Sequence, residues 1–452
     1  MTYKVRHNTE NPLKRIHRLA IPATIAGVAE PFLSLTDTAI VGNIPVQGAQ
    51  ALAAAGIVGS FLSMLVWVLG QTQSAISALV SQYLGKDNLD GIKALPMQAM
   101  YVNVSISLLV LIISMVFKTE IFTLMNASGP LLEMCEQYFS IRIWGFPLTL
   151  FTFGVFGVFR GLQNTLWPMA VALTGAFLNV GLDFILVYGI EGFIEPMFLE
   201  GAAWASLISQ IVMAVFALSL LFLKTDFPLI VKGPIHPELK NIIGMSANLF
   251  VRSLALNTAL ILSVREATAM GTTFIGAHTI LLNLWLFSAF FIEGYGTAGN
   301  SIGGKLLGAK NYTLLWELAK KVAFFGFVMG SILLLFGTLF YNNIGGLFSE
   351  NKATLLAFEE VFFILLICLP TNGVAFVLDG MFKGLGEMKF LRNVLLITSF
   401  GVFVPLVFWS NKMNWGLKGI WVAFGCWMVA RGVALIWKFR RKFLPLKQNA
   451  YI

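Results

Sequence analysis

Twelve stretches of about twenty mostly apolar residues make up most of this 452-residue chain. A helix that spans the hydrocarbon core of a bilayer needs about 20 such residues, so each stretch predicts one transmembrane helix. Charged residues form only 12% of the sequence, against about 25% in an average soluble domain, which excludes a water-soluble fold. The chain is therefore predicted to be an all-α integral membrane protein. The expected helices are centred near Ile25, Leu65, Leu109, Thr149, Phe177, Met213, Leu260, Phe287, Gly330, Leu365, Phe400 and Trp427.

Lysine and arginine are distributed unevenly over the loops between these stretches. With the N-terminus placed inside, five of the 31 basic residues fall on the outer side, three fall within the helices, and the other 23 face the cytoplasm. This bias orients membrane proteins, so both termini are predicted to be cytoplasmic, in the plasma membrane or a bacterial inner membrane. The net charge of +9 then reflects topology rather than nucleic-acid binding. The outer residues are Lys118, Arg265, Lys352, Lys412 and Lys418, and those within helices are Arg142, Arg252 and Arg431.

A repeat with a fixed offset of 223 residues divides the chain into two halves. GVFRGL at Gly157–Leu162 recurs as GMFKGL at Gly380–Leu385, and the same offset relates further matching residues. Several short matches in one register indicate an internal duplication. Because each half has an even number of helices, both halves have the same orientation, as in transporters that work by alternating access. The further pairs include Gly85 with Gly308, Asn88 with Asn311, and Pro147 with Pro370.

The predicted domain organisation follows from this repeat. Residues 1–223 form an N-terminal lobe of six helices, residues 224–241 form a cytoplasmic linker, and residues 242–452 form a C-terminal lobe of six helices. The linker is identified by its polar sequence, KTDFPLIVKGPIHPELKN. We expect twelve transmembrane helices in two pseudo-symmetric six-helix bundles that face each other across a cavity.

Two carboxylic acids lie within the first apolar stretch, in EPFLSLTDTAIVG. Glu30 and Asp37 are seven residues apart, which places them on one face of a helix about 10 Å apart. An acid inside the membrane usually faces a cavity and marks the path of an ion or a substrate. The 223-residue offset maps Asp37 to Leu260, so this acid belongs to one copy of the repeat. A polar residue that the duplication does not share indicates function rather than fold.

The fifth apolar stretch contains NVGLD, in which Asn179 and Asp183 share one helix face. Together with Asp37 they offer oxygen ligands that suit either a sodium ion or a shared proton. Burial and a nearby carboxylate both favour the protonated form of a carboxyl group, so such a site can bind a proton near neutral pH. The structural alternatives are that Asp37 is a hydrogen-bonding hub and that Asn179 links two helices. Pro22 removes a backbone hydrogen bond ahead of Asp37 and lets the first helix bend.

Several of these segments together resemble the multidrug and toxic compound extrusion (MATE) family, in particular its DinF-like branch. They are PATIAGVAEPFLSLTDTAIVG, GKDN, GVFRGLQNT, and LNVGLDFILVYG followed by GAAWAS. The resemblance extends over essentially the whole chain and implies two lobes that form a V. It also implies a cation-coupling site at Asp37, Asn179 and Asp183, with Ser206 in place of a threonine that the branch often has, and a bend of the first helix at Pro22.

The predicted function is secondary active efflux of organic, cationic or amphipathic compounds by antiport. The coupling ion is a proton or a sodium ion, with Asp37, Asn179 and Asp183 as the sodium ligands in the second case. An exporter of organic anions and a flippase of lipid precursors in the same superfamily are the alternatives. The residues contain no nucleophile–base or metal cluster, so enzymatic activity, a cofactor and a nucleic-acid partner are not expected, and the protein is expected to act as a monomer among membrane lipids.

Three further acids are weighed in the second half of the chain. Glu293, together with Glu30 of the first helix, is a candidate for lining the substrate cavity. Whether Glu266, Glu293 or Asp379 takes part in coupling stays open at this point. Another branch of the family uses acids of the second lobe, but Glu266 and Asp379 do not fall convincingly at the positions of those acids.

Overall fold

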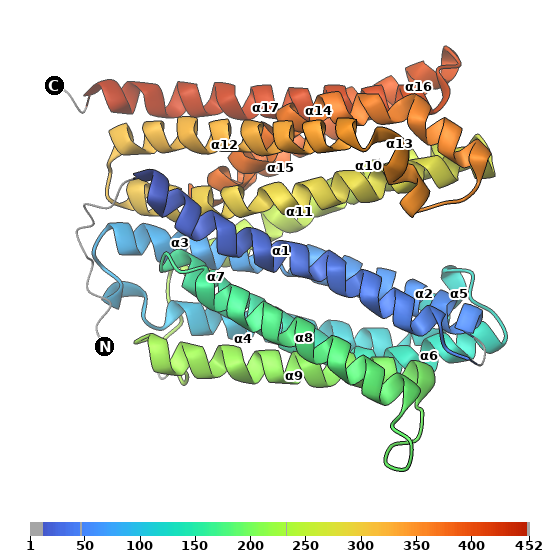
Figure 1. The fold of residues 1–452 in the computed structure, drawn as a ribbon. Coiled ribbons are helices and arrows are strands. Elements are labelled where there is room, and N and C mark those ends of the chain that lie inside the picture. The colour runs from blue at the N-terminus through green and yellow to red at the C-terminus, as the bar shows by residue number, and fades with distance from the viewer. Residues whose placement is uncertain (1–11, 46–47, 232, 450–452) are drawn as a thin grey trace. The chain divides into compact units, whose positions relative to one another are not determined.

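The computed structural model describes residues 12–45, 48–231 and 233–449, apart from the side chains of residues 12, 30–35 and 449 (Figure 1). Within these residues the chain is almost wholly helical, and the one β-type pairing is an isolated bridge between Ile190 and Ile194. The first half contains α1 (Pro12–Gly42), α2 (Gly48–Leu69), α3 (Thr72–Gly85), η1 (Asp90–Ile92), α4 (Leu95–Val116), α5 (Lys118–Leu124), α6 (Pro130–Arg142), α7 (Gly145–Gly161), α8 (Leu166–Tyr188) and α9 (Phe198–Lys224). The second half contains α10 (Leu239–Ala269), α11 (Thr272–Gly308), α12 (Tyr312–Leu339), α13 (Tyr341–Ile344), η2 (Gly345–Leu347), α14 (Lys352–Gly384), α15 (Met388–Thr398), η3 (Ser399–Phe403), α16 (Val404–Lys412) and α17 (Gly416–Asn449).

The helices have the lengths that a membrane requires. Ten helical segments of the described residues are long and apolar enough to span a bilayer, and α6 with α7 forms a further one that is bent by 44°. The 31 residues of α1 add another helix of sufficient length. Each of the twelve expected centres falls within a helix, so the predicted all-α membrane fold is confirmed. The helix expected around Phe400 is continuous, but its middle is the π-helical turn η3.

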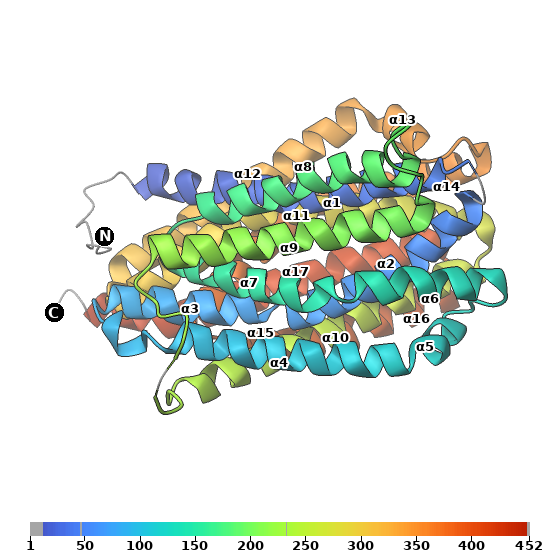
Figure 2. The ribbon, with the colours of Figure 1, turned by 90° about the horizontal axis from the view of Figure 1, so that it is seen from below.

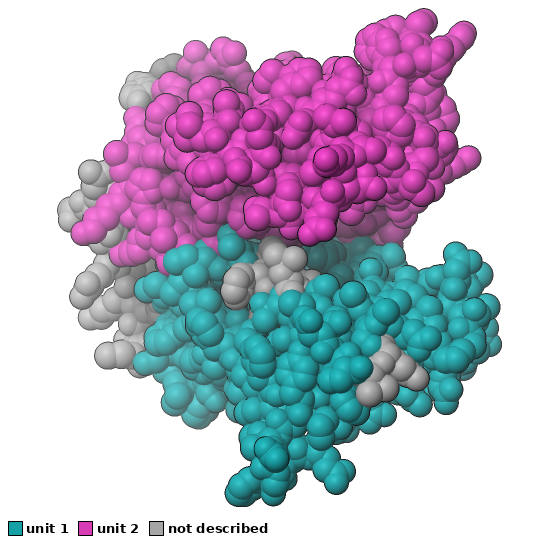
Figure 3. Space-filling view, turned by 45° about the vertical axis from the view of Figure 1, so that its right-hand side comes forward, with its two compact units in different colours: residues 1–7, 25–80, 88–246 teal, residues 8–24, 81–87, 247–452 magenta. Residues whose placement is uncertain are grey.

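The chain divides into two compact units (Figure 3). Unit 1 comprises residues 1–7, 25–80 and 88–246, and unit 2 comprises residues 8–24, 81–87 and 247–452. Within unit 1, the polar segment that follows α9 is held by the start of α4. Gln98 donates from Nε2 to the carbonyl oxygen of Pro234 at 3.0 Å and accepts from the backbone N–H of His236 at 2.8 Å.

Unit 1 is built on paired helices around an aromatic core. α8 lies beside α9 in both views, α4 packs on α7, and α2 packs on α6 (Figures 1 and 2). The rings of Phe122 and Phe139 meet edge to face at 5.2 Å, an arrangement that aromatic pairs favour. Ile40, near the end of α1, belongs to the same core. The core therefore fixes the last turns of α1, which carry Asp37, against the other helices of this unit.

Unit 2 is organised around α14, which packs against α11, α12 and α17. Small residues let the backbones approach closely, as is typical of membrane helices. A Cβ atom at Gly373 of α14 would lie 2.0 Å from the carbonyl oxygen of Gly326 on α12, so this crossing requires glycine. Trp421, Phe424 and Trp427 of α17 fill the adjoining core. This packing brings residues of α10, α14 and α17 together in the interior of the unit.

Matching local geometry in the two halves confirms the predicted repeat. α7 ends at Gly161 and α14 ends at Gly384, 223 residues later. Two residues beyond each end the backbone has a positive φ, 65° at Gln163 and 76° at Gly386. Asparagines at equivalent positions also make the same turn. Asn88 Oδ1 accepts the N–H of the residue three positions later at 3.1 Å, and the side chain of Asn311 does the same at 3.0 Å as the N-cap of α12.

A reciprocal contact within unit 2 follows the same offset. A Cβ atom at Gly85 would lie 2.0 Å from the carbonyl oxygen of Lys305, and one at Gly308 would lie 1.9 Å from that of Gln82. Gln82 and Lys305 are themselves 223 residues apart. The two close approaches are therefore equivalent under the repeat, and each of them excludes a side chain.

Candidate functional site

Asp37 of α1 and Asp183 of α8 are brought together in unit 1. The two helices are joined by the hydroxyl of Tyr188, which donates to the carbonyl oxygen of Ile40 at 2.9 Å. Ile40 lies three residues after Asp37, and Tyr188 lies five residues after Asp183. The carboxyl groups of Asp37 and Asp183 lie within hydrogen-bonding reach of each other, and Asp183 is only 1% exposed. Two acids from distant segments thus form one carboxyl pair, in which Asp183 is buried and Asp37 is half-buried.

The oxygens of this pair have few partners. Among the described residues, no N–H or O–H group donates to Oδ1 of Asp37 or to either carboxyl oxygen of Asp183, although these atoms are buried. Two ionised carboxylates in contact repel each other, and burial removes the water that would screen them. A cation held between them, either a proton or a metal ion that prefers oxygen, satisfies both groups.

Asn179 and Ser206 form the neighbouring polar contact. Asn179 lies one turn before Asp183 on α8, and its Nδ2 donates to the hydroxyl oxygen of Ser206 on α9 at 3.4 Å. Both side chains are buried. The residues expected at the coupling site therefore occur as two linked pairs, Asp37 with Asp183 and Asn179 with Ser206, which α8 connects through its i and i+4 positions.

Two residues of α6 also belong to this site, and the sequence did not point to their role. Arg142 and Tyr138 lie close enough to Asp37 and Asp183 for electrostatic interaction with both carboxyl groups. The guanidinium carbon of Arg142 lies 5.8 Å from the centre of the Tyr138 ring, and its Nε is buried without a hydrogen-bond partner among the described residues. For Arg142 the sequence did contain a signal of a functional position, because it is one of three arginines inside the apolar stretches.

The remaining candidates are placed as follows. The side chain of Glu30 lies outside the described residues, so its role stays a prediction. Pro22 is buried within α1, which is helical from Pro12 to Gly42. Glu293 is exposed on α11. Glu266 on α10 accepts a hydrogen bond from Nδ2 of Asn411 at 2.6 Å.

Asp379 of α14 lies in a second buried polar cluster, in unit 2. Its Oδ1 is 2.7 Å from Nη2 of Arg252 on α10 and 3.5 Å from Nη2 of Arg431 on α17. Its Oδ2 is 3.7 Å from Nζ of Lys383, one turn further along α14. Arg252, Asp379, Lys383 and Arg431 are all buried. The i and i+4 spacing on α14 accounts for the proximity of Asp379 and Lys383, whereas the two arginines come from other helices and have no such spacing.

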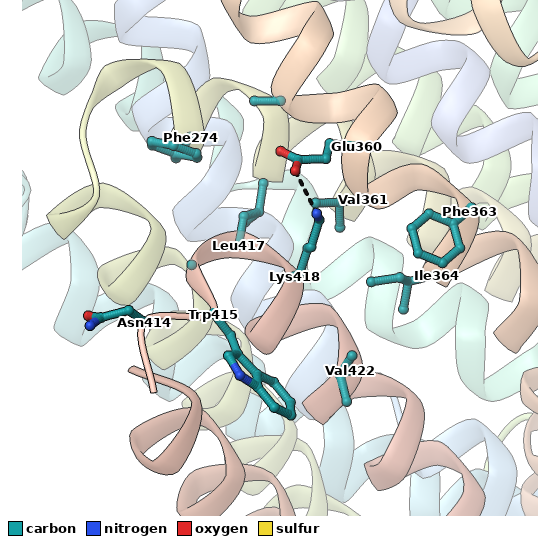
Figure 4. A pocket seen from close by; sticks show the side chains of 12 residues that line it. Phe274, Glu360, Val361, Phe363, Ile364, Asn414, Trp415, Leu417, Lys418 and Val422 are labelled. Carbon is teal, nitrogen blue, oxygen red and sulfur yellow. Dashed lines mark hydrogen bonds and ion pairs between the residues drawn. The ribbon is translucent and has the colours of Figure 1, made fainter. Parts of the chain in front are cut away.

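A surface pocket of about 620 Å³ lies elsewhere in unit 2 (Figure 4). Phe274, Val361 and Trp415 contribute to its apolar lining, and Lys418 Nζ lies 2.5 Å from Oε1 of Glu360 at its wall. None of the residues expected at the coupling site lines this pocket. It is therefore separate from the carboxyl pair and from the Asp379 cluster.

Comparison with known proteins identifies relatives that align with most of the chain. The family model described as MatE matches residues 22–185 and 249–409. The chain is 27% identical over 455 residues to Protein DETOXIFICATION 44, chloroplastic, of Arabidopsis thaliana, covering 96% of this chain and 83% of the plant protein. It is 24% identical over 445 residues to DNA damage-inducible protein F of Escherichia coli (strain K12), covering 94% and 92% of the two proteins.

A solved structure has the same fold. The crystal structure of MATE in the bent conformation superposes with a TM-score of 0.89 at 21% identity and covers 98% of both chains. At this level of identity the likeness concerns the arrangement of the helices. The chemistry of the site has to be argued from the residues of this chain.

Proposed function

Because this chain belongs to the MATE family of transporters, we propose that it exports organic compounds across the membrane in exchange for a proton or a sodium ion. The observation that carries this proposal is the buried contact between Asp37 and Asp183. Oδ1 of Asp37 and both carboxyl oxygens of Asp183 have no donor among the described residues, so the pair needs a cation that can arrive and leave. Binding and release of that cation couple the ion gradient to transport.

The charges around the pair suggest how many cations it takes. With both acids ionised, Asp37 and Asp183 carry two negative charges, and Arg142 supplies one positive charge nearby. One monovalent cation therefore makes the group neutral, and a second would leave it positive in a region where charge is costly. A proton would sit between the two carboxyl groups, whereas a sodium ion would use their oxygens together with Asn179 and Ser206 as ligands.

The ion gradient supplies enough free energy for efflux. One elementary charge that moves inward across 100 mV releases about 2.3 kcal/mol. At about 1.4 kcal/mol per tenfold ratio, this supports between one and two decades of substrate gradient. This value applies when the exported compound is uncharged, because one net charge then crosses the membrane. When a monovalent organic cation leaves in exchange for one cation, no net charge moves, and the pH or sodium gradient supplies the whole driving force.

The membrane, the orientation and the assembly state belong to the same proposal. The loop charges favour a cytoplasmic position for both termini, in the plasma membrane or a bacterial inner membrane. The division into an N-terminal lobe of residues 1–223, a linker and a C-terminal lobe from residue 242, with a bend of α1 at Pro22, is proposed as the moving framework. A single chain contains both lobes, so we propose that the monomer transports.

A second candidate function is the export of organic anions, for which the cluster around Asp379 is the specific observation. Arg252, Lys383 and Arg431 place three cations around a single carboxylate in the interior of unit 2. Such a cluster favours an anionic group over an organic cation. The two candidates share the coupling site in unit 1 and differ in the substrate.

Transport by purified protein in lipid vesicles tests the coupling site. An outward gradient of an organic cation, or of an organic anion, is followed under an imposed pH or sodium gradient. The Asp37→Asn variant is expected to insert normally and to lose gradient-driven export, because its side chain can no longer exchange a charge. Asp90→Asn is the matched control, since Asp90 is 85% exposed in the same unit and pairs only with the exposed Lys93 in the described part of the chain. Undiminished export by Asp37→Asn would refute the coupling role of Asp37.

A further inference from the structure

The cluster around Asp379 carries an excess of positive charge inside unit 2. Arg252 is 7% exposed and Arg431 is 3% exposed, and both guanidinium groups approach the same carboxylate oxygen of Asp379. Lys383 approaches the other oxygen. Within the described residues, no second carboxylate forms an ion pair with any of these three cations. One negative charge therefore faces three positive charges, which leaves a net charge of +2.

An unbalanced charge of this size is costly in a membrane protein. Buried charges are normally paired, and a buried ion without its partner is strongly destabilising. The neighbours of Arg431 reduce this cost only in part. Its guanidinium carbon lies 5.4 Å from the centre of the Trp427 ring, a cation–π contact, and Nη1 approaches the sulfur of Met428 at 3.2 Å. Neither of these neighbours carries a negative charge.

The cluster also retains unused hydrogen-bond donors. Nε of Arg252 is buried without a partner among the described residues. Nη1 of Arg431 has only a thioether sulfur, which is a weak acceptor. Nζ of Lys383 lies 3.7 Å from Asp379, which is too long for a hydrogen bond. Two guanidinium groups and an ammonium group with free N–H donors are the groups that bind carboxylates and phosphates in proteins.

We propose that Arg252, Lys383 and Arg431 form a binding site for an anionic group, a carboxylate or a phosphate, with Asp379 as its internal competitor. The ligand adds negative charge to the cluster. Its oxygens accept hydrogen bonds from the N–H donors that Asp379 leaves without an acceptor. The side chains of Arg252, Asp379 and Lys383 retain 9%, 9% and 11% of their surface exposed, whereas that of Arg431 retains 3%. The anionic group can belong to a soluble organic anion or to a lipid headgroup. This site lies in unit 2 and does not depend on the coupling role of Asp37.

Saturable stabilisation by anions tests the proposal. The unfolding temperature of the purified full chain in a neutral detergent is measured against increasing citrate, and separately against short-chain phosphatidylglycerol. Sodium chloride at matched ionic strength and short-chain phosphatidylcholine are the controls. We expect saturable stabilisation by at least one of the two anions. A response to citrate assigns the site to a soluble anion, and a response to phosphatidylglycerol alone assigns it to a lipid headgroup.

Substitutions then locate the site. Arg431→Gln and Lys383→Gln are expected to weaken anion binding about tenfold, because each removes charged hydrogen-bond donors. Arg265→Gln, on the same helix as Arg252 but exposed, removes the same charge and is expected to leave binding unchanged. Asp379→Asn is expected to lower the unfolding temperature without ligand and to bind the anion about tenfold more tightly, because it removes the competing carboxylate.

The Asp379→Asn variant separates this site from a purely structural ion network. A structural network predicts that the variant is destabilised and that no anion restores it. That result, or the absence of saturable stabilisation of the wild-type protein by both anions, would overturn the proposal. A vesicle experiment in which Asp37→Asn transports normally would refute the coupling role of Asp37 and would leave this binding result unaffected.

Discussion

Replacement of Asp183 by asparagine distinguishes a coupling residue from a structural one. Asp183 is 1% exposed, and neither of its carboxyl oxygens accepts a hydrogen bond from an N–H or O–H donor among the described residues. Its polar contact is with the carboxyl group of Asp37. An asparagine has the same shape, carries no charge and can donate its amide N–H to Asp37. The substitution therefore removes no donor–acceptor pair and relieves a repulsion between two acids.

The expected change in stability follows from this geometry. We expect the free energy of unfolding of Asp183→Asn to stay within about 0.5 kcal/mol of the wild type or to rise, as is common when a functional charge is neutralised. A structural hydrogen-bonding hub would instead lose about 1–3 kcal/mol. For a chain of 452 residues, about 1 kcal/mol corresponds to about 1 °C in the unfolding temperature. A structural hub thus predicts that the unfolding temperature of Asp183→Asn falls by about 1–3 °C, whereas a coupling role predicts no such fall.

Thermal unfolding in detergent, followed by tryptophan fluorescence, measures this difference, and vesicle transport is measured on the same preparations. Asn103→Ala is the control for a lost structural contact, because Nδ2 of Asn103 donates to the carbonyl oxygen of Leu150 at 3.2 Å in the interior of unit 1. We expect that control to melt at a lower temperature and to keep gradient-driven export. Asp183→Asn is expected to show the opposite pattern. A variant that melts lower than the wild type and still transports would refute the coupling role of Asp183.

Three other substitutions test the surroundings of this pair and the packing of the repeat. Arg142→Gln removes the positive charge near both acids, so the two carboxylates should bind a cation more tightly. Proton-driven transport should then extend to higher pH, with recovery in Arg142→Lys; initial rates in vesicles at a series of pH values measure it. Ser206→Ala removes a hydroxyl that is a ligand in the proposed sodium site and is not part of the carboxyl pair that would hold a proton, and it also removes the 3.4 Å hydrogen bond from Asn179. It should therefore lower sodium-driven transport and leave proton-driven transport within about twofold; equal losses under both gradients would contradict this assignment. Gly308→Ala places a Cβ atom 1.9 Å from a backbone oxygen and should lower the free energy of unfolding by about 1–3 kcal/mol, measured by thermal unfolding. Gly244→Ala is the control, because no atom lies within 4 Å of its new Cβ, and its stability should be unchanged.

The membrane made most of the fold predictable. In the hydrocarbon region every backbone polar group needs an internal partner, so an apolar stretch of sufficient length has to be a helix. This is why each of the twelve centres read from the sequence lies in a helix. The sequence did not predict the 44° bend between α6 and α7 or the π-helical turn η3. Both depend on how neighbouring helices pack, as at Phe403, whose ring contacts Phe424 at 4.9 Å.

The first-lobe acids were predictable because they depart from the repeat. Asp37 and Asp183 were expected to meet, and the structure places them in contact. Arg142 was visible as a charge within an apolar stretch, but the sequence does not say which neighbouring helix an arginine faces. The same holds for Arg252, which is separated from Asp379 by 127 positions along the chain. Contacts of this kind arise from tertiary packing and have no local sequence pattern.

The two polar clusters share this relation to the duplicated scaffold. The 223-residue offset maps Asp37 to Leu260, and it maps Asp379 back to Phe156 and Arg252 back to Ala29. Apolar residues thus occupy these equivalent positions in the opposite half, and Ile208 occupies the position equivalent to Arg431. Lys383 differs, because it corresponds to Arg160 and both copies carry this positive charge. The duplicated residues instead set helix ends, turns and close backbone contacts, as Gly85 and Gly308 do. The repeat therefore supplies two similar frameworks, and each has its own buried charge, with an excess of acid in unit 1 and an excess of base in unit 2. A protein that binds a cation in one half and an anionic group in the other needs this asymmetry, which Arg252, Asp379 and Arg431 supply in unit 2.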